Sequence, residues 1–314
     1  MHDYVRAVQT AFRGQGEGAI SILPRQVLWR DAGAGGVRSP SLKLSASVLR
    51  SEQLMGASIY SAHFTPGSLE MWIMLFSAAD GRLAALLNGR ELSLWKTGAT
   101  AALAADRLAR ADASTAAVIG TGYFASTQVL GLASVRHLDE VRCFSRDRDK
   151  RDAFAHWVGD TLPGVAARSC RSAAQAVDGA DIVVTITTSA EPVLFGRWLS
   201  PGVHVNVMGQ HDPRTREVDS DAVAMSRVIV DSRAQALNEK GDLLIPIAEG
   251  RIDSGHVLAE LGEVITGRVA GRTGDGDCTM FCSGGTALEY LGTCAMLLEK
   301  ARAAGIGQEL DTRS

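Results

Sequence analysis

The sequence predicts an α/β protein in which a doubly wound parallel sheet is joined to a smaller β-rich unit. Residues 115–119 form a short apolar run with β-branched side chains, typical of a strand that is buried on both faces. Strand and helix patterns alternate from there onward, as in a parallel sheet with helices on both faces. Before residue 113 the pattern indicates antiparallel strands instead, so the chain changes character at about that point.

A glycine turn follows the first parallel strand. Gly120 permits the turn, Gly122 lets the backbone approach a pyrophosphate, and Ala125 is small enough for close packing of the next helix. The N-terminus of that helix offers free N–H groups and a partial positive charge. The order of strand, glycine turn and helix predicts a dinucleotide-binding Rossmann unit. A glycine turn of some other α/β protein remains the alternative, because the motif alone is weak.

The first third of the chain is expected to hold a short helix, several antiparallel strands and the turns between them. In order, we expect a helix at 3–12, one or two strands at 20–29, a turn at 32–36, strands at 54–64 and 69–76 joined by a turn at 65–68, and a hairpin turn at 79–82 before 83–87. A long helix at 94–111, rich in alanine and leucine, should then cross between the two units.

The parallel sheet should bind its ligand at the carboxyl ends of its strands. The expected elements after the glycine turn are strands at 140–145, 165–170, 181–187, 204–208 and 228–231, with helices at 149–160, 172–177 and 285–304. Thr185, Thr187, Met208, Gly209 and His211 all fall at carboxyl ends of these strands.

Composition excludes several classes of function. The 314 residues carry a formal net charge of −3, so no basic surface argues for nucleic acid or an anionic membrane. We find no apolar run of about 18 residues and no signal-peptide pattern, and we expect a cytoplasmic protein without a membrane segment. The five cysteines are sparse and no metal-ligand spacing occurs, which favours reduced thiols and no metal.

Many short motifs resemble those of the ornithine cyclodeaminase/mu-crystallin family. They include Pro24-Arg25, Lys96-Thr97-Gly98-Ala99, Ile119-Gly120-Thr121-Gly122, Arg216-Glu217-Val218-Asp219, Glu260-Leu261-Gly262-Glu263 and Ser283-Gly284-Gly285-Thr286. Each motif is weak alone, but their number and order extend the resemblance over nearly the whole chain. The resemblance implies a dinucleotide domain at 113–285, inserted into a discontinuous β-rich domain at 1–112 plus 286–314. The outer domain would bind substrate and form a homodimer.

The resemblance also implies an activity. Members of the family bind NAD(H) or NADP(H) and act on amino acids or their imines by hydride transfer. We therefore expect an NAD(P)-dependent oxidoreductase acting on a small amino acid or its imine. Two alternatives stay open, because the fold alone does not choose among activities. One is an ornithine cyclodeaminase, which recycles its NAD, and the other is a small-ligand-binding protein with little turnover.

Two basic residues match the family's substrate-binding positions. Arg25 corresponds to an arginine that binds the substrate carboxylate, and a planar guanidinium suits that task. Lys96 stands where the family usually has arginine, and Thr97 beside it should touch cofactor or substrate. The alternative for both basic residues is a solvated side chain.

Two departures affect the expected catalytic positions. The family's catalytic lysine aligns with Ser58 and the aspartate of ornithine cyclodeaminases aligns with His211. Serine offers neither charge nor basicity, whereas His211 could act as an acid or base near neutral pH. Lys43 could supply an amine from elsewhere, and His211 could be merely structural.

The end of the second parallel strand bears on cofactor choice. An NAD site usually has an acidic residue there, but Ser145 and Arg146 occupy the positions in question. A hydroxyl and a guanidinium suit a 2′-phosphate, so NADP(H) is favoured over NAD(H). Asp147 serving NAD is the alternative. The complete set of expected cofactor contacts is Thr97, Gly120, Thr121, Gly122, Tyr123, Phe124, Ser145, Arg146, Thr185, Thr187, Met208, Gly209, Ser283 and Gly284.

Overall fold

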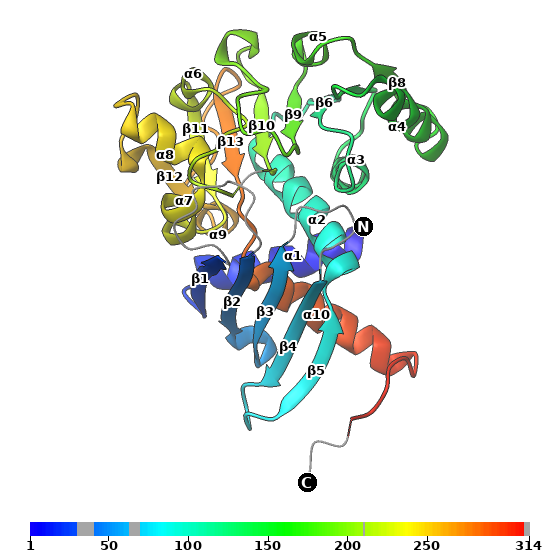
Figure 1. The fold of residues 1–314 in the computed structure, drawn as a ribbon, viewed down its shortest axis with the longest axis vertical. Coiled ribbons are helices and arrows are strands. Elements are labelled where there is room, and N and C mark those ends of the chain that lie inside the picture. The colour runs from blue at the N-terminus through cyan, green and yellow to red at the C-terminus, as the bar shows by residue number, and fades with distance from the viewer. Residues whose placement is uncertain (30–40, 63–69, 210, 311–314) are drawn as a thin grey trace.

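Two β-sheets organise the computed structural model, which describes residues 1–29, 41–62, 70–209 and 211–310 (Figure 1). One sheet is five-stranded and antiparallel, in the order β1-β2-β3-β4-β5. The other is eight-stranded and parallel, in the order β12-β11-β13-β10-β9-β6-β7-β8. The predicted fold class is confirmed. The turns predicted at 32–36 and 65–68 lie outside the described residues.

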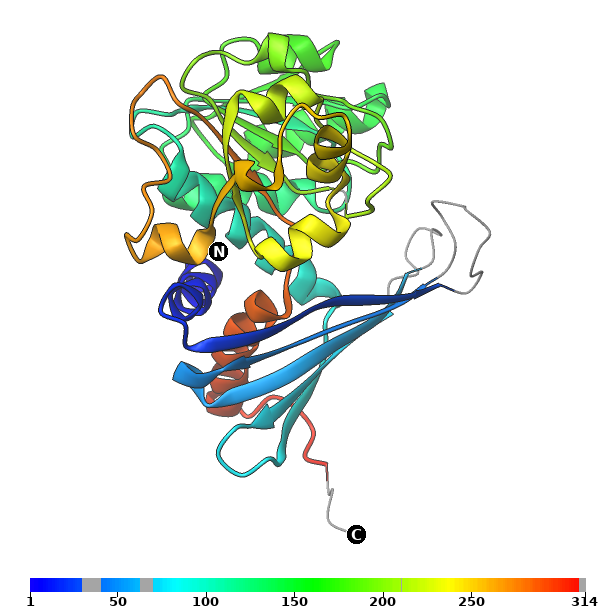
Figure 2. The same ribbon diagram turned by 90° about the vertical axis from the view of Figure 1, so that its left-hand side faces the viewer.

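The antiparallel sheet is covered on one side by α10, and α1 packs against α10 (Figure 2). Its strands are β1 (Ile20–Trp29), β2 (Ser41–Leu49), β3 (Leu54–Ala62), β4 (Glu70–Ser77) and β5 (Leu83–Asn88). The two helices are α1 (His2–Gly16) and α10 (Ala287–Ala303), from opposite ends of the chain. Leu49, Ile73 and Leu75 of the sheet are fully buried on the covered face.

Strand β2 is the element of this sheet that the sequence analysis missed. Its buried face consists of Ser41, Lys43, Ser45, Ser47 and Leu49, whereas the residues between them are half-buried or exposed. The usual arrangement of a half-buried strand, with apolar residues inward and polar residues outward, is therefore largely inverted. Because a polar inner face gives no hydrophobic signal, the segment did not look like a strand.

A bulge in β1 sets the direction of Arg25. The pairing of β1 with β2 shifts register between Leu23 and Gln26, where Pro24 has no N–H to donate to the ladder. The backbone N–H of Arg25 instead donates to Gln235 Oε1 at 3.2 Å. The bulge thus releases Arg25 from the sheet ladder toward the parallel-sheet unit.

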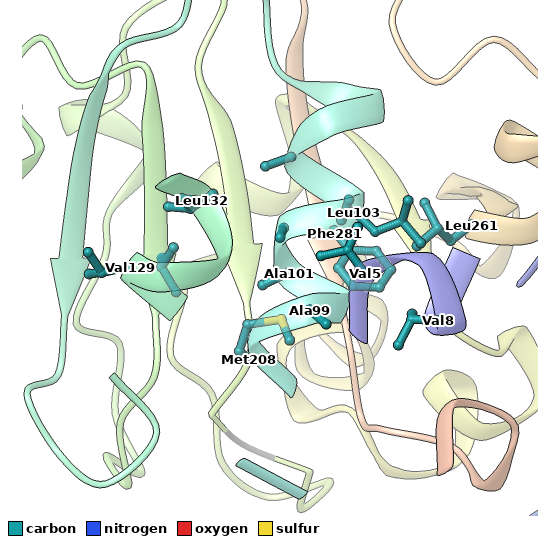
Figure 3. Packing of buried hydrophobic residues seen from close by; sticks show 14 of the residues in the cluster. Val5, Val8, Ala99, Ala101, Leu103, Val129, Leu132, Met208, Leu261 and Phe281 are labelled. Carbon is teal, nitrogen blue, oxygen red and sulfur yellow. The ribbon is translucent and has the colours of Figure 1, made fainter. Parts of the chain in front are cut away.

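Helix α2 (Arg90–Leu108) connects the two sheets and contacts elements of both. It crosses α3 (Ala125–Val135) at close range, because a Cβ on Gly98 would lie 2.2 Å from the carbonyl oxygen of Thr127. Its other side packs into an apolar cluster in which Leu103 lies near Phe281 and Leu261 (Figure 3). The helix predicted at 94–111 therefore has the expected bridging role.

The parallel sheet changes strand order around β6, which lies between β7 and β9. Such a reversal creates a crevice at the carboxyl ends of the strands, where doubly wound sheets bind their ligands. The strands are β6 (Thr115–Ile119), β7 (Glu140–Phe144), β8 (Ala166–Ser169), β9 (Ile182–Thr185), β10 (His204–Val207), β11 (Ser226–Val230), β12 (Val257–Glu260) and β13 (Cys278–Cys282). The helices around them are α4 (Arg148–Thr161), α5 (Ala173–Val177), α6 (Ser220–Ala224), α7 (Arg233–Glu239), α8 (Gly241–Ala248) and α9 (Leu261–Ile265).

Strands β12 and β13 were not predicted. Strand β13 enters the middle of the sheet between β10 and β11, although it comes last in the chain. All five cysteines are free and buried. Over the part of the chain that is described, no helix combines the length and apolarity needed to cross a membrane, and no cluster of side chains suits a metal ion.

Candidate active site at the junction of the two sheets

The glycine turn after β6 has the geometry expected for a phosphate-binding loop. Gly120 has φ 108°, and a Cβ there would lie 2.3 Å from the carbonyl oxygen of Ile186, so only glycine fits. A Cβ on Gly122 would meet no heavy atom within 4 Å, so open space adjoins the turn. Phe124, which precedes α3, makes no side-chain cap; the N–H of Ala125 donates to the carbonyl oxygen of Gly122 at 3.0 Å, and no side chain caps the N–H groups that follow it. These features fit a pyrophosphate.

The end of β7 carries a hydroxyl and a guanidinium rather than a carboxylate. Thr121 Oγ1 donates to Ser145 Oγ at 2.8 Å, which joins this strand end to the glycine turn. Arg146 is exposed. Asp147 caps α4 by accepting a hydrogen bond from the backbone N–H of Lys150 at 3.1 Å, so its carboxylate already has a structural task.

Residues at and just beyond the ends of β9 and β10 donate hydrogen bonds to the carboxylate of Glu217. No role was expected for this residue from the sequence. Thr187 donates to Glu217 Oε1 from its backbone N–H at 2.6 Å and from its hydroxyl at 2.7 Å. Gly209 N–H and Thr185 Oγ1 donate to Glu217 Oε2 at 2.7 and 3.2 Å. The hydroxyls of Thr185 and Thr187, which were expected to contact the cofactor directly, therefore hydrogen-bond to Glu217.

The loop after β10 brings His211 against Lys43 of β2. Lys43 Nζ lies 3.0 Å from His211 Nε2. An ammonium group can only donate, so Nε2 accepts and the ring proton of a neutral imidazole lies on Nδ1. Burial, with a contribution from the neighbouring Arg25, lowers the pKa of Lys43 to about 8.

The surroundings of His211 disfavour its protonated form, contrary to expectation. Burial, followed by the positive charges of Lys43 and Arg25, lowers the pKa of this imidazole well below its usual value. A neutral His211 beside a cationic Lys43 is the arrangement that follows. The group in this pair that titrates in the physiological range is therefore Lys43.

Ser58 offers a hydroxyl and no amine. Its hydroxyl is buried on β3 and lies 2.9 Å from Ser45 Oγ, which is directly opposite on β2. Lys43 carries an amine on the same buried face of β2, two residues before Ser45. The ring of Tyr60, opposite Lys43 on β3, has its centroid 5.9 Å from Lys43 Nζ.

Arg25 is buried and held by three acceptors from the parallel-sheet unit. Its Nη1 donates to Glu239 Oε1 at 2.6 Å, and Nη2 donates to the carbonyl oxygens of Gly284 and Gly285 at 2.7 and 2.6 Å. The Nε–H of Arg25 has no hydrogen-bond partner among the described residues. A ligand carboxylate would satisfy this buried donor.

The acceptors around Arg25 come from α7 and from the turn after β13. Gln235 and Glu239 lie four residues apart on one face of α7, and Gln235 Nε2 donates to Glu239 Oε1 at 2.8 Å. Asp231 Oδ2 accepts from Ser283 Oγ and from the backbone N–H groups of Gly284 and Gly285 at 2.7–2.9 Å. Ser283 and Gly284, expected at the cofactor, therefore build the turn that holds Arg25. The i, i+4 spacing of Gln235 and Glu239 was a signal that could have found this face.

Lys96 is buried rather than solvated. Its Nζ lies 3.2 Å from Glu289 Oε2, and 4.7 Å from the centroid of the Tyr290 ring. Burial alone would lower the pKa of Lys96, but Glu289 and Tyr290 raise it above its usual value. A Cβ on Gly285 would lie 2.8 Å from Lys96 Nζ and 3.8 Å from Arg25 Nη2, so the two cations flank one residue.

The remaining predicted residues surround this junction. Thr97 is half-buried on α2. Tyr123 is 47% exposed and donates to Glu91 Oε1 at 2.7 Å, while Phe124 immediately precedes α3. Met208 is buried beneath α2, close to Ala99 (Figure 3).

Comparison with known proteins identifies the family to which the chain belongs. The model of the ornithine cyclodeaminase/mu-crystallin family matches residues 1–305. The chain is similar to a Delta(1)-pyrroline-2-carboxylate reductase of Bacillus cereus, with 36% identity over 240 residues that cover 76% of this chain and 73% of that protein. It is also similar to the ketimine reductase mu-crystallin of Mus musculus, with 35% identity over 196 residues that cover 62% and 58%.

A solved structure agrees over almost the full length. Delta(1)-pyrroline-2-carboxylate reductase of Thermococcus litoralis, in complex with NADH and L-proline, superposes with a TM-score of 0.91 and 30% identity. The match covers 98% of this chain and 95% of that one. The chain therefore belongs to the ornithine cyclodeaminase/mu-crystallin family.

Proposed function

We propose that the protein is an NAD(P)-dependent oxidoreductase that reduces the C=N bond of a small imino acid, or oxidises the matching amino acid. The observation that carries this proposal is the buried Lys43 ammonium, 3.0 Å from the His211 imidazole and on the same face as Arg25. Reductases of cyclic imino acids among the relatives support it.

Each residue of the site would have a separate role in imine reduction. A bound nicotinamide dinucleotide would supply the hydride, and the glycine turn after β6 fits its pyrophosphate. The Nε–H of Arg25, the donor left without a partner, would hold the substrate carboxylate. Lys43, in its ammonium form, would give a proton to the substrate nitrogen. His211, which accepts a hydrogen bond from Lys43, would keep that ammonium in position.

The charge of the site weighs against ornithine as the substrate. Ornithine carries a second ammonium group, and Arg25, Lys43 and Lys96 all contribute positive charge to the site. Glu239 and Glu289 are already paired with Arg25 and Lys96. The alternative of a ligand-binding protein with little turnover rested on the apparent absence of a catalytic amine. Lys43 offers such an amine, so we do not favour that alternative.

The function is tested with a panel of cyclic and acyclic imino acids, each supplied with NADH and with NADPH. Loss of the absorbance of the reduced cofactor measures net reduction, and an ammonia assay with L-ornithine and catalytic NAD measures cyclodeamination. We expect net reduction of at least one cyclic imino acid and little ammonia. Robust ammonia release without any net reduction would identify a cyclodeaminase instead.

Replacing Lys43 by methionine should lower kcat for imine reduction by about 10²–10⁴-fold, because a general acid contributes that much. Lys43 donates only as an ammonium, so kcat/KM of the wild type should be high below pH about 8 and fall above it. Lys43→Met should abolish this limb of the profile. Lys300→Met, at an exposed ion pair far from the site, is the matched control and should keep both rate and profile. A Lys43→Met enzyme with normal kcat would remove Lys43 from the mechanism.

For the cofactor, we propose a preference for NADPH. Ser145 and the exposed Arg146 follow β7, and Asp147 is engaged in capping α4. A 2′-phosphate would find a cationic and a hydroxyl partner there, without a carboxylate at the position that usually receives a ribose hydroxyl. The relative from Thermococcus litoralis was solved with NADH, so the preference must be measured for this chain.

Replacing Arg146 by alanine should raise the Kd for NADPH roughly tenfold to hundredfold and change the Kd for NADH much less. The reason is the loss of a charge-assisted contact worth about 1.5–3 kcal/mol. Fluorescence titration with each cofactor measures both values, and Arg302→Ala in α10 is a matched control on a distant surface. Equal losses for the two cofactors, or tighter NADH binding by the wild type, would contradict the preference.

We further propose a homodimer formed through the antiparallel sheet. The face opposite α10 exposes large apolar side chains that are neighbours across the strands, among them the pairs Leu28 with Leu42, Ile59 with Trp72, and Met74 with Leu86. Each of these six side chains is at least 37% exposed. A contiguous apolar face of this kind needs a cover, and a second copy of the same face provides one.

Replacing Trp72 by glutamate should convert the dimer to a monomer, because it buries a charge at the centre of the proposed interface. Light scattering during gel filtration measures the molar mass. Met225→Glu, at a similarly exposed apolar residue in the parallel-sheet unit, should leave the mass unchanged. A wild type that runs as a monomer would rule out this interface.

The expected cytoplasmic location also remains a proposal. The five free, buried thiols support it, because reducing compartments keep cysteines in this state. Cell fractionation with a marker enzyme would test it.

A further inference from the structure

We propose that Glu217 is a positioning residue for the nicotinamide end of the cofactor, and that its negative charge favours the oxidised, cationic form of the bound ring. This inference rests on the proposed function, because it requires a nicotinamide dinucleotide. It concerns a residue that lies outside the groups expected to touch the substrate.

The carboxylate of Glu217 is saturated with donors. Thr187 provides two of them to Oε1 at 2.6 and 2.7 Å, and Gly209 and Thr185 provide one each to Oε2 at 2.7 and 3.2 Å. The two backbone N–H groups can only donate, one to each oxygen, which favours the ionised form. Glu217 is fully buried; burial and the neighbouring Asp242 raise its pKa, while the hydrogen bonds from Thr187 and the positive charge of Lys240 oppose that rise.

The position of these donors places Glu217 under the crevice. Thr187 and Gly209 lie just beyond the carboxyl ends of β9 and β10. The glycine turn and β7 lie on the other side of the order reversal and would receive the pyrophosphate and the adenosine half of a dinucleotide. The nicotinamide half would then lie on the β9–β10 side. A Cβ on Gly209 would come within 2.5 Å of Glu217 Oε1, so glycine is needed for this approach.

The main chain of Glu217 is held in place by hydrogen bonds to Asp242. Asp242 Oδ1 accepts from the backbone N–H groups of Glu217 and Val218 at 2.6 and 3.2 Å. Asp242 Oδ2 lies 3.2 Å from Lys240 Nζ, and both side chains are fully buried. Because Lys240 and Asp242 offset each other, Glu217 leaves one negative charge at the ends of β9 and β10.

The consequence is a difference between the two redox forms of the cofactor. The ring is positively charged when oxidised and neutral when reduced, so a nearby buried anion stabilises the oxidised form selectively. The same charge stabilises the positive charge that develops on the ring as the hydride leaves. A residue that only shapes the loop would change the affinity for both forms together.

The test is the pair of dissociation constants for oxidised and reduced cofactor, measured by calorimetric titration on the wild type, E217Q and E140Q. Glutamine keeps the shape of Glu217 and removes its charge. We expect E217Q to raise the Kd of the oxidised form about tenfold more than that of the reduced form. Glu140 lies at the amino end of β7, at the opposite edge of the sheet, and E140Q should leave the ratio unchanged.

Three results separate the possibilities. Equal changes in both constants, or no change, in a folded E217Q protein would overturn the inference. If circular dichroism shows that E217Q does not fold, Thr187→Val is the second variant, because it removes one donor to Glu217 but keeps the charge. It should raise the Kd of both cofactor forms and preserve the ratio of the two constants. A changed ratio would overturn the inference. A wild type that binds neither form would instead overturn the proposed function, and the inference with it.

Discussion

The burial of three cations at the junction of the two sheets is the constraint on which the rest of the site depends. Arg25, Lys43 and Lys96 come from β1, β2 and α2, and all three are less than a tenth exposed. A buried charge is costly unless it is paired. Glu239 and Glu289 pair with two of the cations, whereas Lys43 faces a neutral imidazole. The site therefore keeps one positive charge that can move its proton near pH 8.

This pairing also explains why the site requires both sheets. Glu239 comes from the parallel-sheet unit but holds an arginine from the antiparallel sheet. His211 comes from the loop after β10 but accepts a hydrogen bond from a lysine on β2. Helix α2, which contributes Lys96, packs closely against α3 and keeps the two sheets in a fixed relation. The site thus depends on the contact between the units, and neither unit contains it alone.

The sequence was sufficient for the parts of the molecule that depend on local patterns. The glycine turn at Gly120 and the alternation after it identified the parallel sheet, and Arg25 was placed through a short motif. Strand β2 was not predicted, because its polar side chains face inward and its apolar ones outward. Lys43 was therefore not assigned to a strand. The position expected for the catalytic lysine was Ser58 instead. The burial of Glu217 and Glu239 depends mainly on distant partners, Thr187 at 30 residues and Arg25 at 214 residues. The spacing of Gln235 and Glu239 was the one local hint.

The last elements of the chain complete both sheets. Strand β13 fills the gap between β10 and β11, and α10 covers β2 and β3 and packs on α1. The ion pair between Lys300 and Asp3 joins residues 297 apart in sequence. During synthesis from the N-terminus, the inner faces of β2 and β3 therefore stay uncovered until α10 has been made. Contacts this distant make folding slow, and the nascent chain must be kept from aggregating while its apolar strands wait for their final partners.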